Sequence, residues 1–426
     1  MGTVAIDDLT AGMVLASDLK GSGGRMLLPA GVEVQEVHLK TLKAWGVSEV
    51  DIVEEDDPVA TGEERVASSE IDPQLFQQSE EYLQRFFTRA DRAQPATAEL
   101  FRLGKQRVAE SLARGRQLSQ LPWDDPEVTE ESQLPKDFWY QQPKQPETLL
   151  RGRIELASLP DVYTQIVEVM NSPRSSAADL AEMVSKDTSL SSRMLKLVNS
   201  AFYGFPTRID SISRAVTLIG TNELTTMALG ISVVNAFKDI PCTLMSMEGF
   251  WRHAIACGVF ARLLVAHKVG TSGEQMFIGG LLHDIGRMVM LKQIPKAYAE
   301  VTKQARRAQD TLAATEKRLL GYDHMDVGSL LCTEWRFSKA LEEMVFCHHL
   351  PGRGRYGLGC SVVHLADIMA KVYFAGDPEC GCVMISPLQD KVWETIGLPV
   401  EQLSSLFQQA DRQIDEVITL FLGAED

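Results

Sequence analysis

The sequence predicts a mainly α-helical protein in which a small α+β module and a helical connector precede a large helical domain. From about residue 150 onward, apolar residues recur at the spacing of helix faces, and almost no alternating strand pattern is present. Residues 1–55 instead hold short apolar runs separated by glycine-rich turns. The stretch between them alternates polar, proline-containing segments with two amphipathic patterns.

Residues 1–55 are expected to form the small module. The sequence predicts a short apolar strand at Met13–Ser17, a turn at Gly21–Gly24 and a returning strand at Arg25–Leu28. Apolar side chains at helical spacing predict a helix over Glu36–Trp45, and an alternating pattern predicts a further strand over Val47–Val53. The module carries no catalytic pattern in its sequence.

Residues 56–149 are expected to connect the module to the helical domain. Residues 56–72 are polar and acidic, which predicts a linker, and residues 73–119 predict two amphipathic helices broken at Gln94-Pro95. The apolar stripe of these helices packs either on the same chain or on a second copy, so a homodimer is one expectation. Residues 120–149 predict a proline-rich linker. Part of it should be pinned to a domain surface, because it carries four large aromatic residues, Trp123, Phe138, Trp139 and Tyr140.

Residues 150–375 are predicted to form the helical domain, and residues 376–426 a C-terminal helical extension that packs on it. Ser176 followed by Asp179 is typical of a capped helix start. The apolar spacing further predicts helices over 250–267, 275–291, 295–308, 312–320, 324–336, 338–349, 358–375, 387–396 and 399–422.

The composition is that of an ordinary globular protein. The chain has 426 residues, of which 45% are hydrophobic and 23% charged, and its formal net charge is −16. This acidic balance argues against nucleic acid as the main partner, because phosphate binding needs clustered positive charge. No apolar run is long enough for a membrane span, and the N-terminus lacks a signal-peptide pattern. The cysteine count of 7 is odd, and most lie in apolar helical contexts, which predicts reduced thiols and a cytoplasmic location.

The segment Leu281–Arg287 gives the strongest indication of a functional site. His283 and Asp284 lie side by side within an apolar helical run. Burial of an ionised carboxylate among leucines is costly unless a cation or hydrogen bonds compensate it. A metal ion is the simplest such partner for Asp284.

The histidines supply further candidate ligands, because 7 of the 8 in the chain lie after residue 250. Imidazole and carboxylate groups suit Fe, Mn, Zn or Mg, and helix bundles build metal sites from facing helices. The ordered set can serve one ion or two, and two ions about 3.5–4 Å apart are the usual arrangement for phosphoester hydrolysis. His38 and His267 are expected to lie outside any site, whereas His364 is either a ligand or a support for one.

Several motifs follow one another along the helical domain: Leu159-Pro160, the segment from Lys186-Asp187 to Asn199-Ser200-Ala201-Phe202-Tyr203-Gly204, Phe250-Trp251-Arg252-His253, Leu281–Gly286, Gly321-Tyr322-Asp323-His324, His348-His349 and His364-Leu365-Ala366-Asp367. With these motifs, residues 150 to about 375 resemble the HDOD domain, a branch of the HD superfamily found in bacterial signalling proteins. Residues 4–53 resemble the small module that precedes some HDOD and HD-GYP domains, in Pro29-Ala30-Gly31-Val32 and Trp45-Gly46-Val47.

The resemblance implies an all-helical fold, the bacterial cytoplasm and a role in signal transduction. The positions where the catalytic HD superfamily places metal ligands are filled here by His253, His283, Asp284, His324, His348, His349 and Asp367. HD-GYP phosphodiesterases carry a lysine at the position of Arg287, and a Gly-Tyr-Pro signature that Leu350–Gly357 lacks. An arginine can still hold phosphate with two parallel hydrogen bonds.

Two functional hypotheses follow. The first is a regulatory protein whose HDOD domain keeps a divalent metal site and passes a signal to a protein partner or responds to a nucleotide-type ligand. The second is a metal-dependent phosphohydrolase that acts on a nucleotide or cyclic nucleotide. In the second hypothesis Asp284 bridges two ions, and Arg287 or Arg353 steadies the phosphate.

Overall fold

The computed structural model divides into two units, Met1–Ala67 and Ser68–Asp426, which are described separately. In the first unit the structure describes Gly2–Ile6 and shorter pieces as far as Ile52. In the second it describes residues 71–118, 134–135, 137–150, 176–205, 207–237, 246–266, 268, 270–355, 357–377 and 384–423. Among these residues, no helix combines the length and apolar character that a membrane span requires.

The first unit contains two short antiparallel strand pairs. Strand β1 (Gly2–Ala5) pairs with β4 (Glu49–Ile52), and β2 (Leu19–Lys20) pairs with β3 (Met26–Leu28). The two ends of this unit's described chain therefore meet in one sheet. A small cluster of buried side chains packs beside the strands: Leu9, Leu15, Val34, Leu42 and Val50.

The strand predictions for this unit were right in part. The strands at residues 26–28 and 49–52 lie where the sequence predicted them. The partner of β3 is Leu19–Lys20 rather than Met13–Ser17, because the strands of a tight hairpin directly flank their turn. Leu15, from the predicted strand, forms an isolated bridge with Ile52 instead. Most of the predicted helix Glu36–Trp45 lies outside the described residues.

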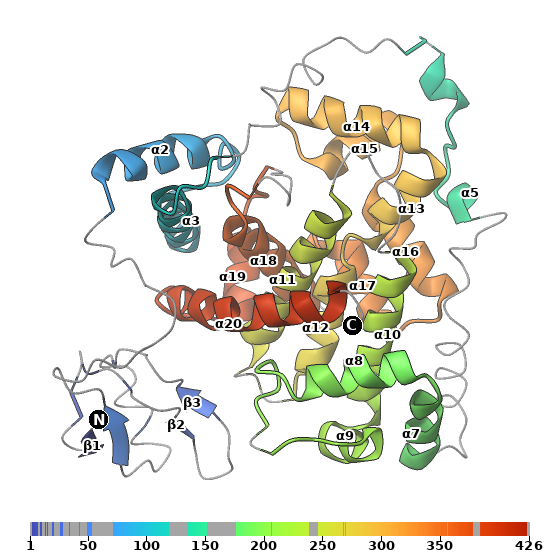
Figure 1. Ribbon diagram of the computed structural model, residues 1–426. Helices are drawn as coiled ribbons and strands as arrows, with labels where there is room; N and C mark the ends of the chain where they lie inside the picture. The colour runs from blue at the N-terminus through green and yellow to red at the C-terminus, as the bar shows by residue number, and fades with distance from the viewer. Residues whose placement is uncertain are drawn as a thin grey trace. The chain divides into compact units, whose positions relative to one another are not determined.

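Every regular element among the described residues of the second unit is a helix (Figure 1). Its elements are α2 (Pro73–Gln84), α3 (Pro95–Ala113), η1 (Phe138–Gln141), α5 (Glu147–Leu150), α7 (Ala177–Lys186), α8 (Thr188–Val198), α9 (Ile212–Ile219), α10 (Thr221–Phe237), α11 (Met247–Val265), α12 (Gly273–Leu282), α13 (Ile285–Gln293), α14 (Pro295–Ala308), α15 (Leu312–Leu320), α16 (His324–Glu334), α17 (Lys339–Cys347), η2 (Pro351–Arg353), α18 (Gly357–Tyr373), α19 (Asp390–Ile396) and α20 (Gln402–Leu422). The mainly α-helical fold class predicted from the sequence is confirmed. Ser176 caps α7 and forms the predicted reciprocal pair of hydrogen bonds with Asp179.

Helices α11, α12 and α18 form the centre of the second unit (Figure 1). Almost every residue of α11 and α18 is buried, which explains why their sequences are apolar all round. Helices α11 and α12 approach each other closely at Gly280, where a Cβ would lie only 2.7 Å from the Cys257 carbonyl oxygen. Helix α20 packs on α11, so residues of the C-terminal region complete the core.

The helix predicted over 275–291 is wrong in one respect, because the structure breaks it in two. Helix α12 ends at Leu282, and α13 begins at Ile285, so His283 and Asp284 form the junction. Helix α13 crosses α16 so closely that a Cβ at Gly286 would lie 2.0 Å from the His324 carbonyl oxygen. This tertiary contact favours a change of direction that helix periodicity cannot reveal.

The connector helices α2 and α3 form a hairpin that packs on the chain's own helices. Helix α3 packs closely on α18 at Gly104, where an added Cβ would lie 3.1 Å from Val372 Cγ1. Arg107 of α3 stacks 3.9 Å above the Tyr373 ring and pairs with Asp411 at 2.8 Å. The apolar stripe of the hairpin is thus covered within one chain.

The linker before the helical domain is partly pinned down, as its aromatic residues suggested. Leu149 of α5 is buried, and α5 contacts α13 and α16. Phe138 and Trp139 are half-buried against the main core, whereas Tyr140 is exposed. Trp123 lies outside the described residues.

Candidate metal centre

The structure brings all seven candidate ligands of the sequence together. They come from separate places in the second unit: the middle of α11 (His253), the junction of α12 and α13 (His283 and Asp284), the start of α16 (His324), the end of α17 (His348 and His349) and the middle of α18 (Asp367). Local capping fixes one of these positions, because Asp323 caps α16 directly before His324 in a reciprocal capping box with Asp326.

The ligands form two groups. In the first, called the Asp284 group, one ligand atom from each of Asp284, His324, His348 and His349 lies within 4.8 Å of the others. In the second, called the Asp367 group, the same holds for His253, His283 and Asp367. These are the donor types that hold Fe, Mn or Zn in helix bundles.

The two groups adjoin each other at His283. Its Nε2 lies 3.6 Å from Asp284 Oδ2 and also 3.6 Å from Asp367 Oδ1. On the other side, His349 Nδ1 lies 3.9 Å from Asp367 Oδ2. The arrangement therefore offers adjacent places for one ion or two.

Hydrogen bonds on the far side of three imidazoles point their other nitrogen into the cluster. The Nδ1–H of His283 donates to the Gly280 carbonyl oxygen at 2.6 Å, and that of His348 donates to the Val345 carbonyl oxygen at 2.8 Å. The Nδ1–H of His324 donates to a Glu316 carboxylate oxygen at 2.6 Å. In a neutral ring this leaves Nε2 with a free lone pair.

Those lone pairs meet other acceptors. The Nε2 of His324 lies 3.3 Å from Nε2 of His348 and 3.2 Å from Asp284 Oδ1, and no N–H remains between them in the neutral rings. Among the described residues, the buried His283 Nε2 and His349 Nδ1 also lack a hydrogen-bond partner. Acceptors that face one another inside a protein are compensated by a bound cation or by protonation of one of the rings. The donor set therefore fits a metal ion.

Burial lowers the pKa of three of the five ligand imidazoles and so favours their neutral form, whereas neighbouring groups outweigh burial and raise the pKa of His283 and of His324. Burial lowers the pKa of His348 to about 4, and it lowers the pKa of His253 and of His349 as well. For His324 burial acts in the same direction, but the Glu316 carboxylate outweighs it and raises the pKa. Neutral imidazoles are the form that binds metal.

The two ligand carboxylates stay ionised because each has its own basic side chain. Burial would raise the pKa of Asp284, but His283 and the guanidinium of Arg287, 2.6 Å from Oδ2, hold it well below its usual range. Burial would likewise raise the pKa of Asp367, but the Lys371 ammonium, 2.6 Å from Oδ2, outweighs it. In both carboxylates the basic side chain pairs with Oδ2, and imidazole nitrogens lie within 4 Å of both oxygens.

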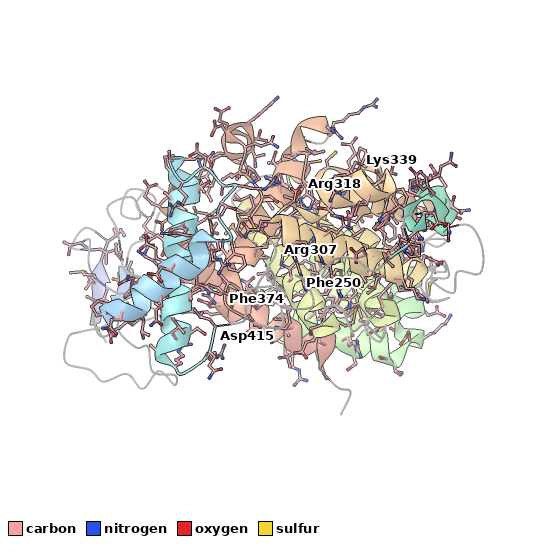
Figure 2. The ribbon with its side chains drawn as sticks, turned by 90° about the horizontal axis from the view of Figure 1, so that it is seen from above. Phe250, Arg307, Arg318, Lys339, Phe374 and Asp415 are labelled. Atoms are coloured by element: carbon pink, nitrogen blue, oxygen red, sulfur yellow. The ribbon has the colours of Figure 1, made fainter. Side chains whose placement is uncertain are left out.

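A closed ring of five side chains holds Asp284 from both sides. Arg287 donates to Asp284 and, through Nε, to the Tyr298 hydroxyl at 3.2 Å. The Tyr298 hydroxyl donates to Glu316 at 3.1 Å, and His324 links Glu316 back to Asp284. Arg287 also lies over the ring of Phe250, 5.7 Å from its centroid (Phe250 is labelled in Figure 2).

Three of these supporting residues were not predicted. Lys371 lies four residues after Asp367 on the same helix face, which is a recognisable signal for an ion pair. Tyr298 and Glu316 lie on α14 and α15, and no local pattern connects either of them to the ligands.

His364 lies beside the cluster. His364 belongs to neither ligand group, because its Nδ1–H donates to the His348 carbonyl oxygen at 2.7 Å and its Nε2 lies 3.2 Å from the Pro387 carbonyl oxygen. It supports the ligand pair His348-His349 rather than the ion. His38 and His267 lie outside the described residues.

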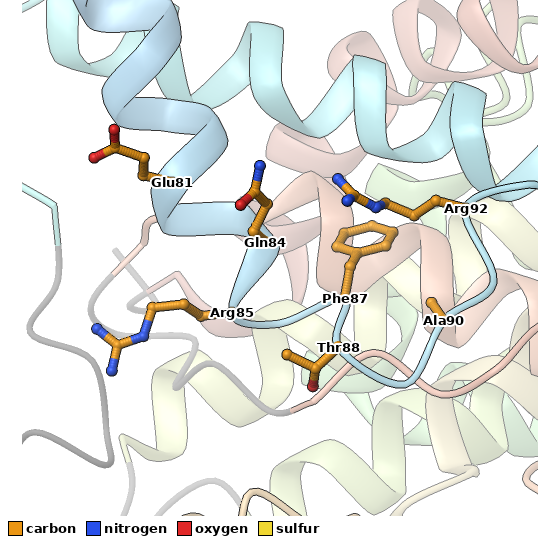
Figure 3. Close-up of a pocket in the computed structure, with 7 residues that line it drawn as sticks. All are labelled: Glu81, Gln84, Arg85, Phe87, Thr88, Ala90 and Arg92. Carbon is orange, nitrogen blue, oxygen red and sulfur yellow. The ribbon is translucent and has the colours of Figure 1, made fainter.

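A hollow of about 590 Å³ at the turn between α2 and α3 is separate from this cluster (Figure 3). Its Arg92 side chain is engaged, since the guanidinium lies 4.8 Å from the centroid of the Phe101 ring. The hollow contributes no ligand to the metal centre, and its lining residues are Glu81, Gln84, Arg85, Phe87, Thr88, Ala90 and Arg92.

The fold and the cluster define a helical-bundle protein with a histidine and aspartate metal centre. Comparison with known families makes this specific: residues 156–351 match the HDOD domain, and the chain carries an HDOD domain at these positions. The match ends before Asp367 and Lys371, so α18 completes the cluster beyond it.

Solved structures share this architecture. A protein from Shewanella amazonensis SB2B, provisionally named a phosphohydrolase, is 25% identical and has a TM-score of 0.51, over 64% of this chain and 97% of that chain. An HDOD domain protein of unknown function from Geobacter sulfurreducens is 21% identical with a TM-score of 0.54, over 65% of this chain and 97% of that chain.

A curated relative adds no function. An uncharacterized protein of Treponema pallidum (strain Nichols) is 25% identical over 197 residues, which are 46% of this chain. The match spans 38% of that relative's length.

Proposed function

We propose that this protein is a regulatory HDOD protein of bacterial signal transduction whose helical domain holds a divalent metal at the His/Asp cluster. The observation that carries the proposal is the set of acceptors that face one another in the interior. Nε2 of His324, Nε2 of His348 and Oδ1 of Asp284 lie 3.2–3.6 Å apart with no donor among them when the rings are neutral. A divalent cation can be bound by the lone pairs of all three atoms.

Two ions can be assigned to the two groups. Asp284, His324, His348 and His349 would hold one ion, and His253, His283 and Asp367 would hold another. An ion bound there supplies Lewis-acid polarisation to an anionic ligand. Glu316 and His364 hold two of the ligands in place, and Arg287 and Lys371 neutralise the carboxylates.

The regulatory reading is favoured by how enclosed the cluster is. The side chains of His283 and His348 are 0% exposed, and the most open ligand, His349, is 18% exposed. Both basic side chains at the cluster are bound to ligand carboxylates rather than directed to solvent. The segment after His349 also lacks the Gly-Tyr-Pro signature. An enclosed ion of this kind suits a state that is sensed by a protein partner or tuned by a nucleotide-type ligand.

Elemental analysis tests the metal claim. The full chain, purified without chelator and resupplied with Mn, Fe or Zn, should retain divalent metal after desalting. Asp284→Ala should lose metal from its group, whereas Asp411→Asn should retain the full amount, because Asp411 is an ion-paired carboxylate on α20 outside the cluster. Wild-type protein without bound metal would contradict the proposal.

A second candidate function is hydrolysis of a phosphoester, favoured by the adjacency of the two ligand groups. In this reading Arg287, 15% exposed, turns from Asp284 to hold a phosphate with two hydrogen bonds. A screen of phosphodiesters, nucleotides and cyclic dinucleotides with added Mn or Fe tests it. The enzyme hypothesis fails if wild type and Asp284→Ala turn over every substrate equally slowly.

A further inference from the structure

Two thiols lie together beside the metal centre. Cys347 is the last residue of α17, and Cys360 lies in the first turn of α18. Their side chains are hydrogen-bonded to each other, and the Cys360 thiol also donates to the Glu343 carbonyl oxygen at 3.6 Å. The other two free cysteines of the described residues, Cys257 and Cys332, lie apart on α11 and α16.

The loop between the two helices runs directly over this pair. A Cβ at Gly354 would lie 2.6 Å from Cys360 Sγ and 3.3 Å from Cys347 Sγ, so only glycine lets the backbone approach so closely. The neighbouring Arg353 and Arg355 are exposed. The backbone of this loop therefore lies directly against the two buried sulfur atoms.

We propose that Cys347 and Cys360 form a reversible disulfide, a redox-modification site distinct from the metal ligands. A disulfide forms readily where two thiols already approach each other across a short loop. The pair joins a helix end to a helix start, positions where small movements do not break a helix interior. The loop Leu350–Arg355 must lift for an oxidant to enter, and its glycines allow this.

A low-molecular-weight disulfide such as oxidised glutathione is the co-reactant. One cysteine, as its thiolate, attacks the glutathione disulfide and releases one glutathione thiol. The second cysteine then attacks the mixed disulfide and releases the other glutathione. The protein loses two hydrogen atoms and glutathione disulfide gains two, so the exchange balances.

The link would act on the metal centre through the backbone. Cys347 directly precedes His348 and His349, and His364, one turn after Cys360, donates to the His348 carbonyl oxygen. Bond formation brings the sulfur atoms to about 2.05 Å, which moves the end of α17 against α18. The expected result is weaker metal retention in the oxidised protein, an effect that rests on the proposed function.

Peptide mapping tests the disulfide itself. The full chain is prepared with serine at the three cysteines outside the described residues, Cys242, Cys380 and Cys382. After native incubation with oxidised glutathione and alkylation, the main product should be a peptide pair linked through Cys347 and Cys360, reversed by dithiothreitol. Cys360→Ala should abolish the link, whereas the matched variant Cys332→Ala should keep it.

Two results would overturn the disulfide proposal: all four thiols staying reduced in the folded protein, or a link that joins a different pair. Circular dichroism of each variant identifies any that fails to fold. Metal content is measured separately on oxidised and reduced wild type. Equal retention overturns the coupling to the metal centre, whereas reduced protein without metal contradicts the proposed function and leaves the disulfide result standing.

Discussion

Glu316→Gln is the perturbation that most directly tests how the cluster is held together. Glu316 is 0% exposed and accepts three hydrogen bonds: from the Tyr298 hydroxyl, from the His324 backbone N–H and from His324 Nδ1–H. Glutamine keeps the size of the side chain but removes its charge. Its amide oxygen can accept from His324, and its NH₂ group then faces one of the remaining donors.

The magnitude follows from these contacts. Hydrogen bonds to charged groups contribute about 1.5–3 kcal/mol and neutral ones about 0.5–1.5 kcal/mol, so the loss of charge costs about 1–1.5 kcal/mol for each hydrogen bond that Glu316 accepts. Replacing a carboxylate that orients a metal-binding imidazole lowers metal affinity roughly 10–100-fold. The loss of metal affinity should affect the Asp284 group, which contains His324, and not the Asp367 group.

Competition of the purified protein against a chelator of known affinity measures this effect. Wild type should titrate in two steps if two ions bind, and Glu316→Gln should weaken one step only. Glu300→Gln is the matched control, since Glu300 is also buried in this unit and its carboxylate accepts a hydrogen bond from Gln304, outside the cluster. Wild-type affinity in Glu316→Gln, with a loss in Asp284→Asn, would refute the role assigned to the ring.

Three further predictions concern stability. Gly286→Ala places a Cβ 2.0 Å from the His324 carbonyl oxygen and should lower the free energy of unfolding by about 3 kcal/mol or more. Gly352→Ala, whose Cβ would meet nothing within 4 Å, should leave it unchanged, and thermal melts of both variants decide this. Lys371→Met removes the cation that pairs with the Asp367 carboxylate, which is 1% exposed and keeps only its imidazole contacts. The variant should destabilise the metal-free protein by about 3 kcal/mol, with metal restoring the melting temperature; equal metal-free melting temperatures would contradict it. Burial lowers the pKa of His348 to about 4, below its unfolded value of about 6.5. As pH falls from about 6.5 toward 4, protonation of His348 therefore favours the unfolded chain, and its contribution should lower the free energy of unfolding of the metal-free protein by about 3 kcal/mol. Urea unfolding in chelator at both pH values checks this, and a flat profile in that window would exclude it.

Helix positions were predictable because they depend on local spacing. The helices predicted over 295–308 and 312–320 coincide with α14 and α15, where an apolar stripe occurs together with a start signal: Pro295 in the first turn of α14 and the Thr311 cap of α15. The break at His283-Asp284 was not predictable, because it depends on the close crossing of α13 and α16. Strand partners in the first unit failed for a similar reason, since pairing is set by the turn and by distant residues.

The candidate ligands were predictable as chemical types in a fixed order, whereas their supports were not. An imidazole or a carboxylate in an apolar run signals a need for a partner wherever the partner lies. Tyr298 and Glu316 give no such signal, because a tyrosine or a glutamate in an amphipathic helix is commonplace. Their role arises only when α14 and α15 fold back toward α13 and α16.

The charge balance of the cluster ties the metal to the ligand it would serve. With neutral imidazoles, the carboxylates of Asp284, Asp367 and Glu316 face the cations of Arg287 and Lys371, which leaves one negative charge. A divalent ion reverses that sign, and charges act strongly in an enclosed site. A nucleotide-type ligand should therefore bind the metal-loaded protein and bind weakly or not at all after chelation. Calorimetric titration of both forms with the same nucleotides measures this, and metal-independent binding would place the ligand site elsewhere.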